Sequence, residues 1–399
     1  MTQAAFFCGI KSDIPVGLTD LAEEGWKSGV QMPDMDTLRP MSWLSTDRWK
    51  VGSVICDFHN ASGFRAETSP REIARRQVLA LRGLGFEPMV SALFELTIFY
   101  KNSVVPVSPH EDLSTVLSQL AIACDQSAIP IESVGLGLEP GKLYIVLKEQ
   151  PALELADNVH RLRGVTRSVC GRAEYDVTFM TKALPNISSN RLHLTWRLLG
   201  SDQINVFSSP GQSSEPSLLC RHWLAGQLEH NPATCALARP TVNCYRKDGN
   251  ISEEGLETES SDSGILTSCT RVVWEGGSVR LLDSTPTSAS NPYLVIAAVM
   301  AAGISGITNK MELSLSESQT VVERWLNRTP QSLNHAMECL ENDQVMKCQL
   351  GTLFITRFLY VKAEFEIERI EKRSFSEENK NGGDFSDFQN ERDLYLLSL

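Results

Sequence analysis

The spacing of apolar residues predicts most of the secondary structure of this 399-residue chain. Short apolar runs and period-two alternation, which are typical of strands, occur in residues 52–59, 89–100, 141–149, 176–180 and 191–199. Apolar residues at helical spacing occur in residues 68–86, 151–175, 332–350 and 351–373. In the first of these helices, Ser69 and Pro70 mark the amino-terminal end and Gly85 lies near the other end.

The longest apolar run, residues 293–307, follows a Ser-Asn-Pro sequence. It is too short to span a bilayer, and Ala and Gly dilute its hydrophobicity. Because proline is favoured at the first position of a helix, the run predicts a buried helix. Strands and helices follow one another without regular βαβ alternation, which favours the α+β class with an antiparallel sheet.

Three segments lack a clear pattern and suggest how the chain is divided. Residues 1–45 are loop-rich, and residues 46–373 form the expected main domain. Residues 248–270 contain several acids but no Lys or Arg, which predicts a mobile, solvated loop. Residues 374–399 form a polar tail, and its apolar end, DLYLLSL, is expected to dock on another surface.

Charge and cysteine content exclude some classes of function. The formal net charge of −12 argues against nucleic acid as a partner, because phosphate binding needs a basic face. It fits a cytoplasmic protein without a membrane partner. The ten cysteines include no CxxC pair. Cys56 and His59 are not followed by a second pair of Cys or His ligands at zinc-finger spacing. Reduced, mostly buried thiols are therefore expected in place of a zinc site.

Glu95 is the one carboxylate in the apolar stretch SALFELTIFY. Burying a carboxylate costs several kcal/mol unless a cation or hydrogen-bond donors offset the lost hydration. Glu95 is therefore a metal ligand, half of a structural ion pair, or the remnant of a site that has otherwise disappeared.

From about Met41 onward, the chain resembles the catalytic domain of glutamine synthetase. The resemblance lies in six segments that occur in the family's order: ICDFHNASGFRAETSPREIARRQ, PALELADNVHRLRGV, VTFMTKAL, LAGQLEHNPATCALARPTVNCYRK, SASNPYLVIAAVMAAGISGI and TPQSLNHAMECLENDQVMKCQLGTLFITRFLYVKAEFE. The residues of these segments are most similar to those of the family branch found in the vertebrate lens. The resemblance implies a glutamine synthetase/guanido kinase-like catalytic fold, with residues 1–45 as the remnant of a reduced amino-terminal β-grasp domain.

The family's chemistry, as the resemblance implies it, needs two divalent metals. Glutamate attacks the γ-phosphate of ATP, and ammonia then displaces phosphate from the acyl phosphate. Carboxylates and one histidine hold the metals, as hard cations require. Arginines bind glutamate and the transferring phosphoryl group, and a mobile acidic loop closes the site.

The resemblance assigns six positions to metal ligands. They are occupied here by Leu93, Glu95, Gly137, Tyr144, His193 and Leu282. Glu95 and His193 are therefore residual metal positions, and the other four residues cannot coordinate a divalent ion as carboxylates do. Losing even a residue that orients a ligand costs roughly 10- to 100-fold in metal affinity, so two-metal catalysis is not expected.

The substrate positions are altered as well. The family's Asn-Gly pair becomes Ser188 and Ser189, and an arginine position becomes Ser284. Another arginine position is matched loosely by Ile265. The residues left for phosphate or substrate binding are Lys247, Arg246 and Arg280, and the position of the flap acid, with its catalytic role, is Glu253.

The resemblance and the lost ligands together predict a catalytically inactive homologue. Such a pseudoenzyme has a structural or chaperone-like role as a cytoplasmic, ring-type homo-oligomer, and the lens branch implies intermediate filaments as partners. One alternative is an ATP-dependent ligase joining ammonia or an amine to glutamate with residual or altered activity, using Mg²⁺ or Mn²⁺. Another is a binding module that keeps one ligand without turnover. No cofactor is expected for the inactive form.

Overall fold

The computed structural model describes residues 29–60, 62–209, 212–246, 270–275, 277–312, 328–370 and 391–396. The predictions for Lys247, Glu253 and Ile265, for the 248–269 loop and for the 374–390 tail therefore concern residues outside the described set. Within that set, no helix has the length and apolar character needed to cross a membrane.

An antiparallel hairpin is the first described element. β1 (Val30–Pro40) pairs with β2 (Gly52–His59), and the 3-10 helix η2 (Ser42–Leu44) lies between them. The predicted strand at 52–59 is confirmed. The prediction of loops throughout residues 1–45 is wrong for β1, because this strand is exposed on both faces and so shows no apolar alternation. No separate β-grasp domain is evident beside the hairpin in the described residues.

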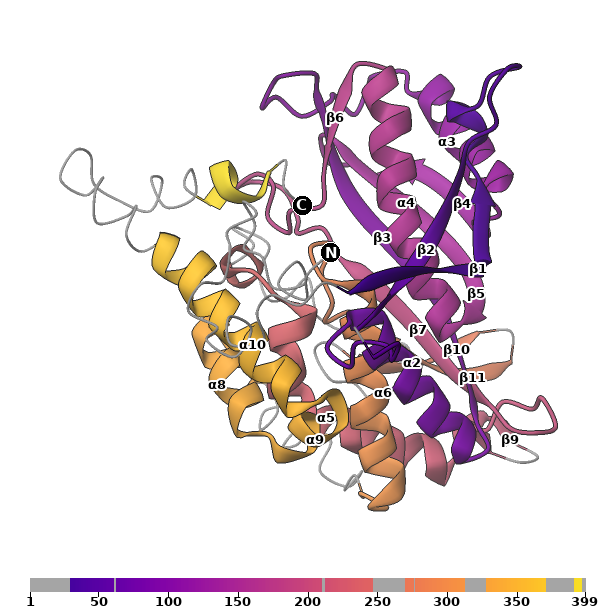
Figure 1. Ribbon diagram of the computed structural model, residues 1–399, viewed down its shortest axis with the longest axis vertical. Coiled ribbons are helices and arrows are strands. Elements are labelled where there is room, and N and C mark those ends of the chain that lie inside the picture. The colour runs from indigo at the N-terminus through magenta and orange to yellow at the C-terminus, as the bar shows by residue number, and fades with distance from the viewer. Residues whose placement is uncertain are drawn as a thin grey trace.

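A seven-stranded sheet forms the centre of the molecule (Figure 1). Its order is β10-β11-β7-β3-β5-β4, and β6 pairs with β3 outside this path. The strands are β3 (Glu87–Tyr100), β4 (Ile131–Leu136), β5 (Lys142–Pro151), β6 (Tyr175–Thr178), β7 (Leu192–Leu199), β10 (Thr270–Glu275) and β11 (Ser278–Asp283). All pairings are antiparallel, which confirms the predicted α+β class. A separate small sheet pairs β8 (Ser208–Ser209) with β9 (Gln212–Pro216).

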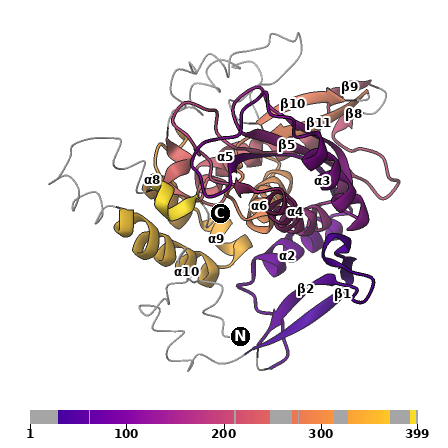
Figure 2. The same cartoon turned by 90° about the horizontal axis from the view of Figure 1, so that it is seen from above.

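Alternation along the strands separates two faces of the sheet. On β3, Ala92 and Phe94 are buried, whereas Leu93 and Glu95 are partly exposed. The buried face is covered by helices: α4 (Ala152–Arg172) contacts β3, and the view from above shows α4 and α6 on the same side (Figure 2). The partly exposed face, which carries Leu93 and Glu95, is called the open face below.

Local sequence explains where the remaining helices start. These helices are α2 (Pro70–Gly83), α3 (Ser114–Gln126), α5 (Leu218–Ala238) and α6 (Pro292–Thr308). Pro70 and Pro292 stand in the first turns of α2 and α6, as predicted. The Asn291 side chain caps α6 by accepting from the Tyr293 and Leu294 N–H groups. The 3-10 helix η3 (Val242–Tyr245) follows α5.

Helices α5 and α6 cross at glycines. A Cβ atom added to Gly226 would lie 2.2 Å from the Ala302 carbonyl oxygen, and one added to Gly306 would lie 2.0 Å from the His222 carbonyl oxygen. Neither backbone atom can give way, so only glycine permits this approach. The close crossing sets the position of α5 relative to α6 in the helical layer.

The carboxyl-terminal helices are α8 (Leu333–Asn342), α9 (Gln344–Leu350) and α10 (Thr352–Lys362), which continues as a π-helical turn (Ala363–Ile367). The single helix predicted over residues 332–350 is broken at Asp343. There the Asp343 side chain caps α9 by accepting from the Met346 N–H at 3.0 Å. A capping aspartate ends one helix as it begins the next.

The final described segment, residues 391–396, docks on the chain itself. Leu394 and Tyr395 are 1% and 0% exposed, and they pack with Met180 and Ile370. The Tyr395 hydroxyl donates to Glu366 Oε1 at 2.5 Å. The expectation that the apolar end docks is confirmed for its described part, residues 393–396, which packs on the chain's own domain.

Candidate functional site

The strand register brings four of the six predicted ligand positions together on the open face. Leu93 on β3 lies directly opposite His193 on β7, and Glu95 lies directly opposite Tyr144 on β5. Directly opposite residues of an antiparallel pair point to the same face. The four side chains therefore form two adjacent rows.

The other two positions border these rows. Leu282 on β11 lies opposite Thr195, which is two residues from His193 on the same strand. Gly137 follows the end of β4, where its N–H donates to the Lys142 carbonyl at 2.9 Å. The open face thus carries all six predicted positions, although sequence spacing spreads them over 190 residues, roughly half the chain.

Glu95 is paired with an ammonium group. Lys142 Nζ lies 3.5 Å from Glu95 Oε2, and that oxygen also accepts from the Arg191 N–H at 3.0 Å. Lys142 is buried, and its Nζ donates to the Ser189 carbonyl and to Asn190 Oδ1, both at 2.9 Å. The question raised by Glu95 therefore has an answer: it is half of an ion pair built into the chain.

Tyr144 and Lys142 fill the space beside Glu95. A Cβ atom added to Gly135 would lie 2.5 Å from the Tyr144 hydroxyl, so the Tyr144 ring lies across the glycine of the neighbouring strand. A Cβ atom added to Gly137 would lie 2.8 Å from Lys142 Cβ. A glutamate at position 137 would therefore displace the lysine stem.

His193 is held as a neutral group. Its Nδ1 lies 2.9 Å from Ser284 Oγ. Burial lowers the pKa of His193 to about 4, and although Glu95 raises it, the charges of Arg191 and Arg271 act in the same direction as burial. Ser284, at a position that the resemblance assigns to an arginine, is thus the hydrogen-bond partner of the imidazole.

The serine pair beside this site is fixed by an acid of the same chain. The Ser188 N–H donates to Glu139 Oε1 at 2.9 Å, and its hydroxyl donates to Glu139 Oε2. The Ser189 carbonyl is the acceptor for Lys142. Sequence reasoning did not identify Glu139.

Arg280, predicted to bind phosphate, is engaged on the open face. Its Nη1 donates to Glu149 Oε1 at 3.0 Å, and its Nε lies 3.2 Å from Glu275 Oε2. Arg197 donates to the same Glu149 Oε1 from Nε at 2.7 Å. An incoming phosphate would have to displace these carboxylates.

Arg246, the second predicted anion binder, is engaged by the carboxyl-terminal segment. Its Nε donates to Glu391 Oε2 at 2.7 Å, and Asn243 Nδ2 donates to the same oxygen at 3.0 Å. Glu391 is 2% exposed. The structure therefore does not bring Arg246 and Arg280 together as free cations, and their phosphate-binding role stays a prediction.

Comparison with known proteins decides the family. The family model of the glutamine synthetase catalytic domain matches residues 67–381. The chain belongs to the glutamine synthetase family. This family consists of ATP-dependent glutamate–amine ligases that normally use Mg²⁺ or Mn²⁺, and its members form homo-oligomeric rings.

Two curated relatives show the range of proteins similar to this chain. Lengsin from Rattus norvegicus is 28% identical over 358 residues, which cover 86% of this chain and 62% of lengsin. The chain thus spans less than two thirds of rat lengsin. A glutamate–isopropylamine ligase from Pseudomonas sp is 25% identical over 309 residues, which cover 72% of this chain and 67% of the ligase.

A crystal structure of a novel glutamine synthase homolog shares the fold. It superposes with a TM-score of 0.77 at 19% sequence identity, and the match covers 99% of this chain and 91% of that chain. The likeness confirms the predicted glutamine synthetase catalytic fold.

The metals that glutamine synthetases use do not fit the residues found here. Four of the six positions carry Leu, Gly, Tyr and Leu, and an ammonium group stands beside the remaining carboxylate. Within the described residues, no group of three or more His, Cys, Asp or Glu side chains could hold a metal ion. Divalent Mg²⁺ or Mn²⁺ needs several oxygen ligands, and a nearby ammonium repels it.

The sequence did not identify Lys142 as a site residue, although it lies in one of the motifs compared with the family. It stands in the PGKLY string, at the position where the glutamine synthetase motif has the glutamine of PGQ. The consequence could not be deduced from spacing, because only the β3–β5 register brings position 142 beside Glu95.

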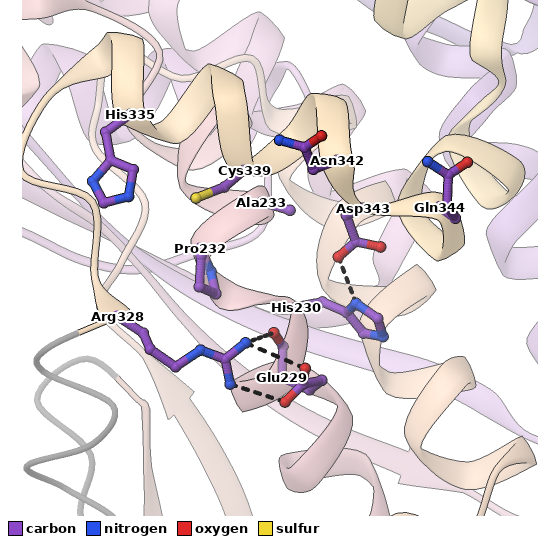
Figure 3. A pocket seen from close by; sticks show the side chains of 10 residues that line it. All are labelled: Glu229, His230, Pro232, Ala233, Arg328, His335, Cys339, Asn342, Asp343 and Gln344. Carbon is purple, nitrogen blue, oxygen red and sulfur yellow. Dashed lines mark hydrogen bonds and ion pairs between the residues drawn. The ribbon is translucent and has the colours of Figure 1, made fainter.

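A cavity of about 590 Å³ lies away from the open face, between α5 and the α8–α9 junction (Figure 3). His230 and Asp343 point toward one another there, with His230 Nδ1 2.7 Å from Asp343 Oδ2. His230 Nε2 lies 3.0 Å from Ser305 Oγ. Ser305 lies within α6 and is 4% exposed, so it cannot reach a substrate. The chain of contacts joins three helices and serves the fold.

Proposed function

We propose that this chain is a catalytically inactive member of the glutamine synthetase family, with a structural or chaperone-like role. The observation that supports the proposal most is the ion pair between Lys142 and Glu95. An ammonium group, fixed by the chain, stands where a divalent ion would need carboxylate ligands.

The proposal follows from charge and shape together. A metal at Glu95 would lie within a few ångströms of the Lys142 ammonium, and like charges at such distances repel by about 1–4 kcal/mol in partly solvated surroundings. Leu93 and Tyr144 add no charge that would offset this repulsion. Phosphoryl transfer depends on metal ions to neutralise charge that develops in the transition state. Without them, that charge is not stabilised and the reaction is slow.

The likeness to lengsin supports the non-catalytic role. By this analogy, the chain acts in the cytoplasm as a homo-oligomer and associates with intermediate filaments in lens cells. Members of the family form homo-oligomeric rings, which supports self-association of this chain. No nucleic-acid or membrane partner and no cofactor belong to this proposal.

The alternative is an ATP-dependent ligase that joins ammonia or an amine to glutamate. The similarity to glutamate–isopropylamine ligase supports it at the level of the family. It requires metal binding at the open face with residual ligands only, namely Glu95 and His193.

The test is an assay with glutamate, ATP, Mg²⁺ or Mn²⁺, and either ammonia or isopropylamine. An active glutamine synthetase serves as the positive control, and ADP and amide product are measured separately. We expect no amide product and no calorimetric heat of Mn²⁺ binding. Metal-dependent turnover of even about 1 s⁻¹, within the ordinary range of enzymes, would overturn the proposal in favour of the ligase.

A further inference from the structure

The second half of α4 carries basic side chains and no acidic ones. The sequence has no Asp or Glu between Asp157 and Glu174. The arginines in this interval are Arg161, Arg163, Arg167 and Arg172. Among the described residues, no carboxylate forms an ion pair with any of them. The chain has a net charge of −12, so this helix concentrates positive charge against the overall balance.

Two of these arginines, Arg167 and Arg172, are exposed and are held by neutral groups. The Arg167 Cζ lies 5.0 Å from the centroid of the Phe179 ring. Arg172 Nη1 donates to the carbonyl of Trp43, which lies in η2 of the hairpin beside α4 (Figure 1). A guanidinium has five N–H donors, and an aromatic ring and a carbonyl supply no negative charge. Both side chains therefore keep the capacity to bind a carboxylate.

The arginines of α2 show how this chain neutralises positive charge elsewhere. Arg71 donates to Asp57 and to Asp157, both at 2.8 Å. On α4, burial and then the neighbouring charge of Arg167 lower the pKa of Arg163 to about 10. The two α4 guanidiniums thus repel one another, and no described carboxylate offsets that repulsion.

Small residues separate the two exposed arginines. Gly164, Ser168 and Gly171 follow the spacing i, i+4, i+7, so they share one stripe of α4, with Arg167 on one side and Arg172 on the other. A Cβ atom added to Gly164 or Gly171 would meet no atom within 4 Å. Glycine is unfavourable inside a helix, and the packing of the described chain does not require it here. This stripe with its two arginines, called the outer face of α4 below, allows another backbone to approach closely.

We propose that the outer face of α4 docks an acidic polypeptide segment, whose backbone lies over Gly164 and Gly171 and whose carboxylates pair with Arg167 and Arg172. Charge complementarity selects this partner, because guanidinium groups bind carboxylates with two parallel hydrogen bonds. From Gly164 to Arg172 the helix rises about 12 Å, which an extended segment of about four residues spans. A long nucleic acid is disfavoured, because the rest of a chain of net charge −12 repels it.

The experiment is a titration of a fluorescein-labelled peptide of ten glutamates with the full chain at low salt, followed by fluorescence anisotropy. We expect saturable binding that weakens as salt rises. Arg167→Gln is expected to raise the Kd about threefold, because it removes one exposed ion pair. Gly164→Leu keeps every charge, and leucine is a better helix former than glycine. It is expected to raise the Kd about fivefold, because the new side chain prevents close approach.

The matched controls lie on α2. Arg82→Gln makes the same change of charge at an exposed arginine, and Gly83→Leu adds the same side chain at an exposed helical glycine with open space around it. An equal loss of affinity in Arg82→Gln, or an unchanged Kd in Gly164→Leu, would overturn the surface. Equally tight binding of a labelled ten-nucleotide oligothymidine would overturn the choice of partner. Absence of peptide binding would overturn the proposal and leave the proposed function intact, because the outer face of α4 does not include the open face.

Discussion

The Lys142 ammonium changes the charge beside the predicted metal-ligand positions. Its ammonium contacts the carboxylate of Glu95, the carbonyl of Ser189 and the amide oxygen of Asn190. A buried cation with three oxygen partners has its lost hydration offset, whereas removal of the cation leaves those oxygens unsatisfied. The residue therefore stabilises the face that carries the predicted ligand positions.

Lys142→Met is expected to lower the free energy of unfolding by about 1–3 kcal/mol, because buried acceptors lose their donor. Urea denaturation would measure the change. Lys148→Met provides the control, since Lys148 is exposed on the same strand and its replacement should cost no more than about 0.5 kcal/mol. Equal effects of the two changes would show that the ammonium has no special role.

Leu93→Glu addresses the same site from the opposite direction. The change restores one acidic position, but the new carboxylate would lie two residues from Glu95 on the same face, with no complete metal site. We expect no amide synthesis and a loss of about 1–2 kcal/mol in stability. Tight Mn²⁺ binding by this variant in calorimetry would show that the remaining ligand positions are assigned wrongly.

At the scale of elements, ion pairs join the hairpin to the helical layer. Asp57 on β2 accepts from Arg71 Nη1 at 2.8 Å and from Arg75 Nη2 at 2.7 Å, both on α2. Arg71 also donates from Nε to Asp157 on α4 at 2.8 Å, and the Tyr293 hydroxyl of α6 donates to that aspartate at 2.7 Å. Four elements thus meet at two carboxylates.

This network makes the hairpin sensitive to acid. Burial raises the pKa of Asp57, but the hydrogen bond from Arg71 and the charges of Arg75 and Arg71 outweigh burial and hold it below its ordinary 3.8. A carboxyl whose pKa is lower in the folded state stabilises the fold above the unfolded pKa and stops doing so as pH falls through the folded value. Asp57→Asn should therefore cost about 3–5 kcal/mol at pH 7.

The pH dependence provides the check on this prediction. Urea denaturation of the wild type and of Asp57→Asn should give a stability difference that is largest near neutral pH and shrinks below about pH 4. A difference that is constant down to pH 3 would contradict the assignment to the charged form of Asp57.

The carboxyl-terminal segment is the second element that ties distant parts together. Leu394 is 1% exposed, so Leu394→Ala is expected to cost about 2–5 kcal/mol by leaving a cavity against Met180 and Ile370. Thermal unfolding would measure the loss. Asp393→Ala, at the exposed neighbouring position, should have a small effect, and a large one would mean that the segment is held by charge.

For the whole molecule, the sequence was most informative where one face of an element is buried. The strands at 52–59, 141–149 and 191–199 were predicted because burial of one face imposes a period on their apolar residues. The helix at 293–307, which is buried on all sides, was predicted from its continuous apolar run after a Ser-Asn-Pro sequence. Helix α5 was not predicted from the sequence, because Pro232 lies within it and Gly226 lies at its crossing with α6, and both residues are unfavourable inside helices. The six site positions came from resemblance, whereas the Lys142–Glu95 contact depends on a register that no local pattern encodes.

Self-association is expected at this scale, and the hairpin offers an exposed apolar surface for it. Val30, Met32, Met35 and Leu38 of β1 are 48–63% exposed, and exposed apolar groups at such density favour an interface. Met35→Glu should lower the assembly size measured by light scattering. Leu138→Glu is the control, because Leu138 is 99% exposed but lies outside the hairpin. A monomeric wild type, or an unchanged assembly in the Met35 variant, would contradict the prediction.

Under the proposed function, the pairing of Glu95 with Lys142 also changes what this protein requires from its surroundings. A dissociable ion is present only as far as its supply exceeds its dissociation constant, and chelating molecules compete for it. An ammonium carried by the polypeptide has a local concentration that is set by the fold and cannot be diluted. Under the proposed function, the open face therefore keeps the same charge whether the cell is starved of divalent ions or rich in them.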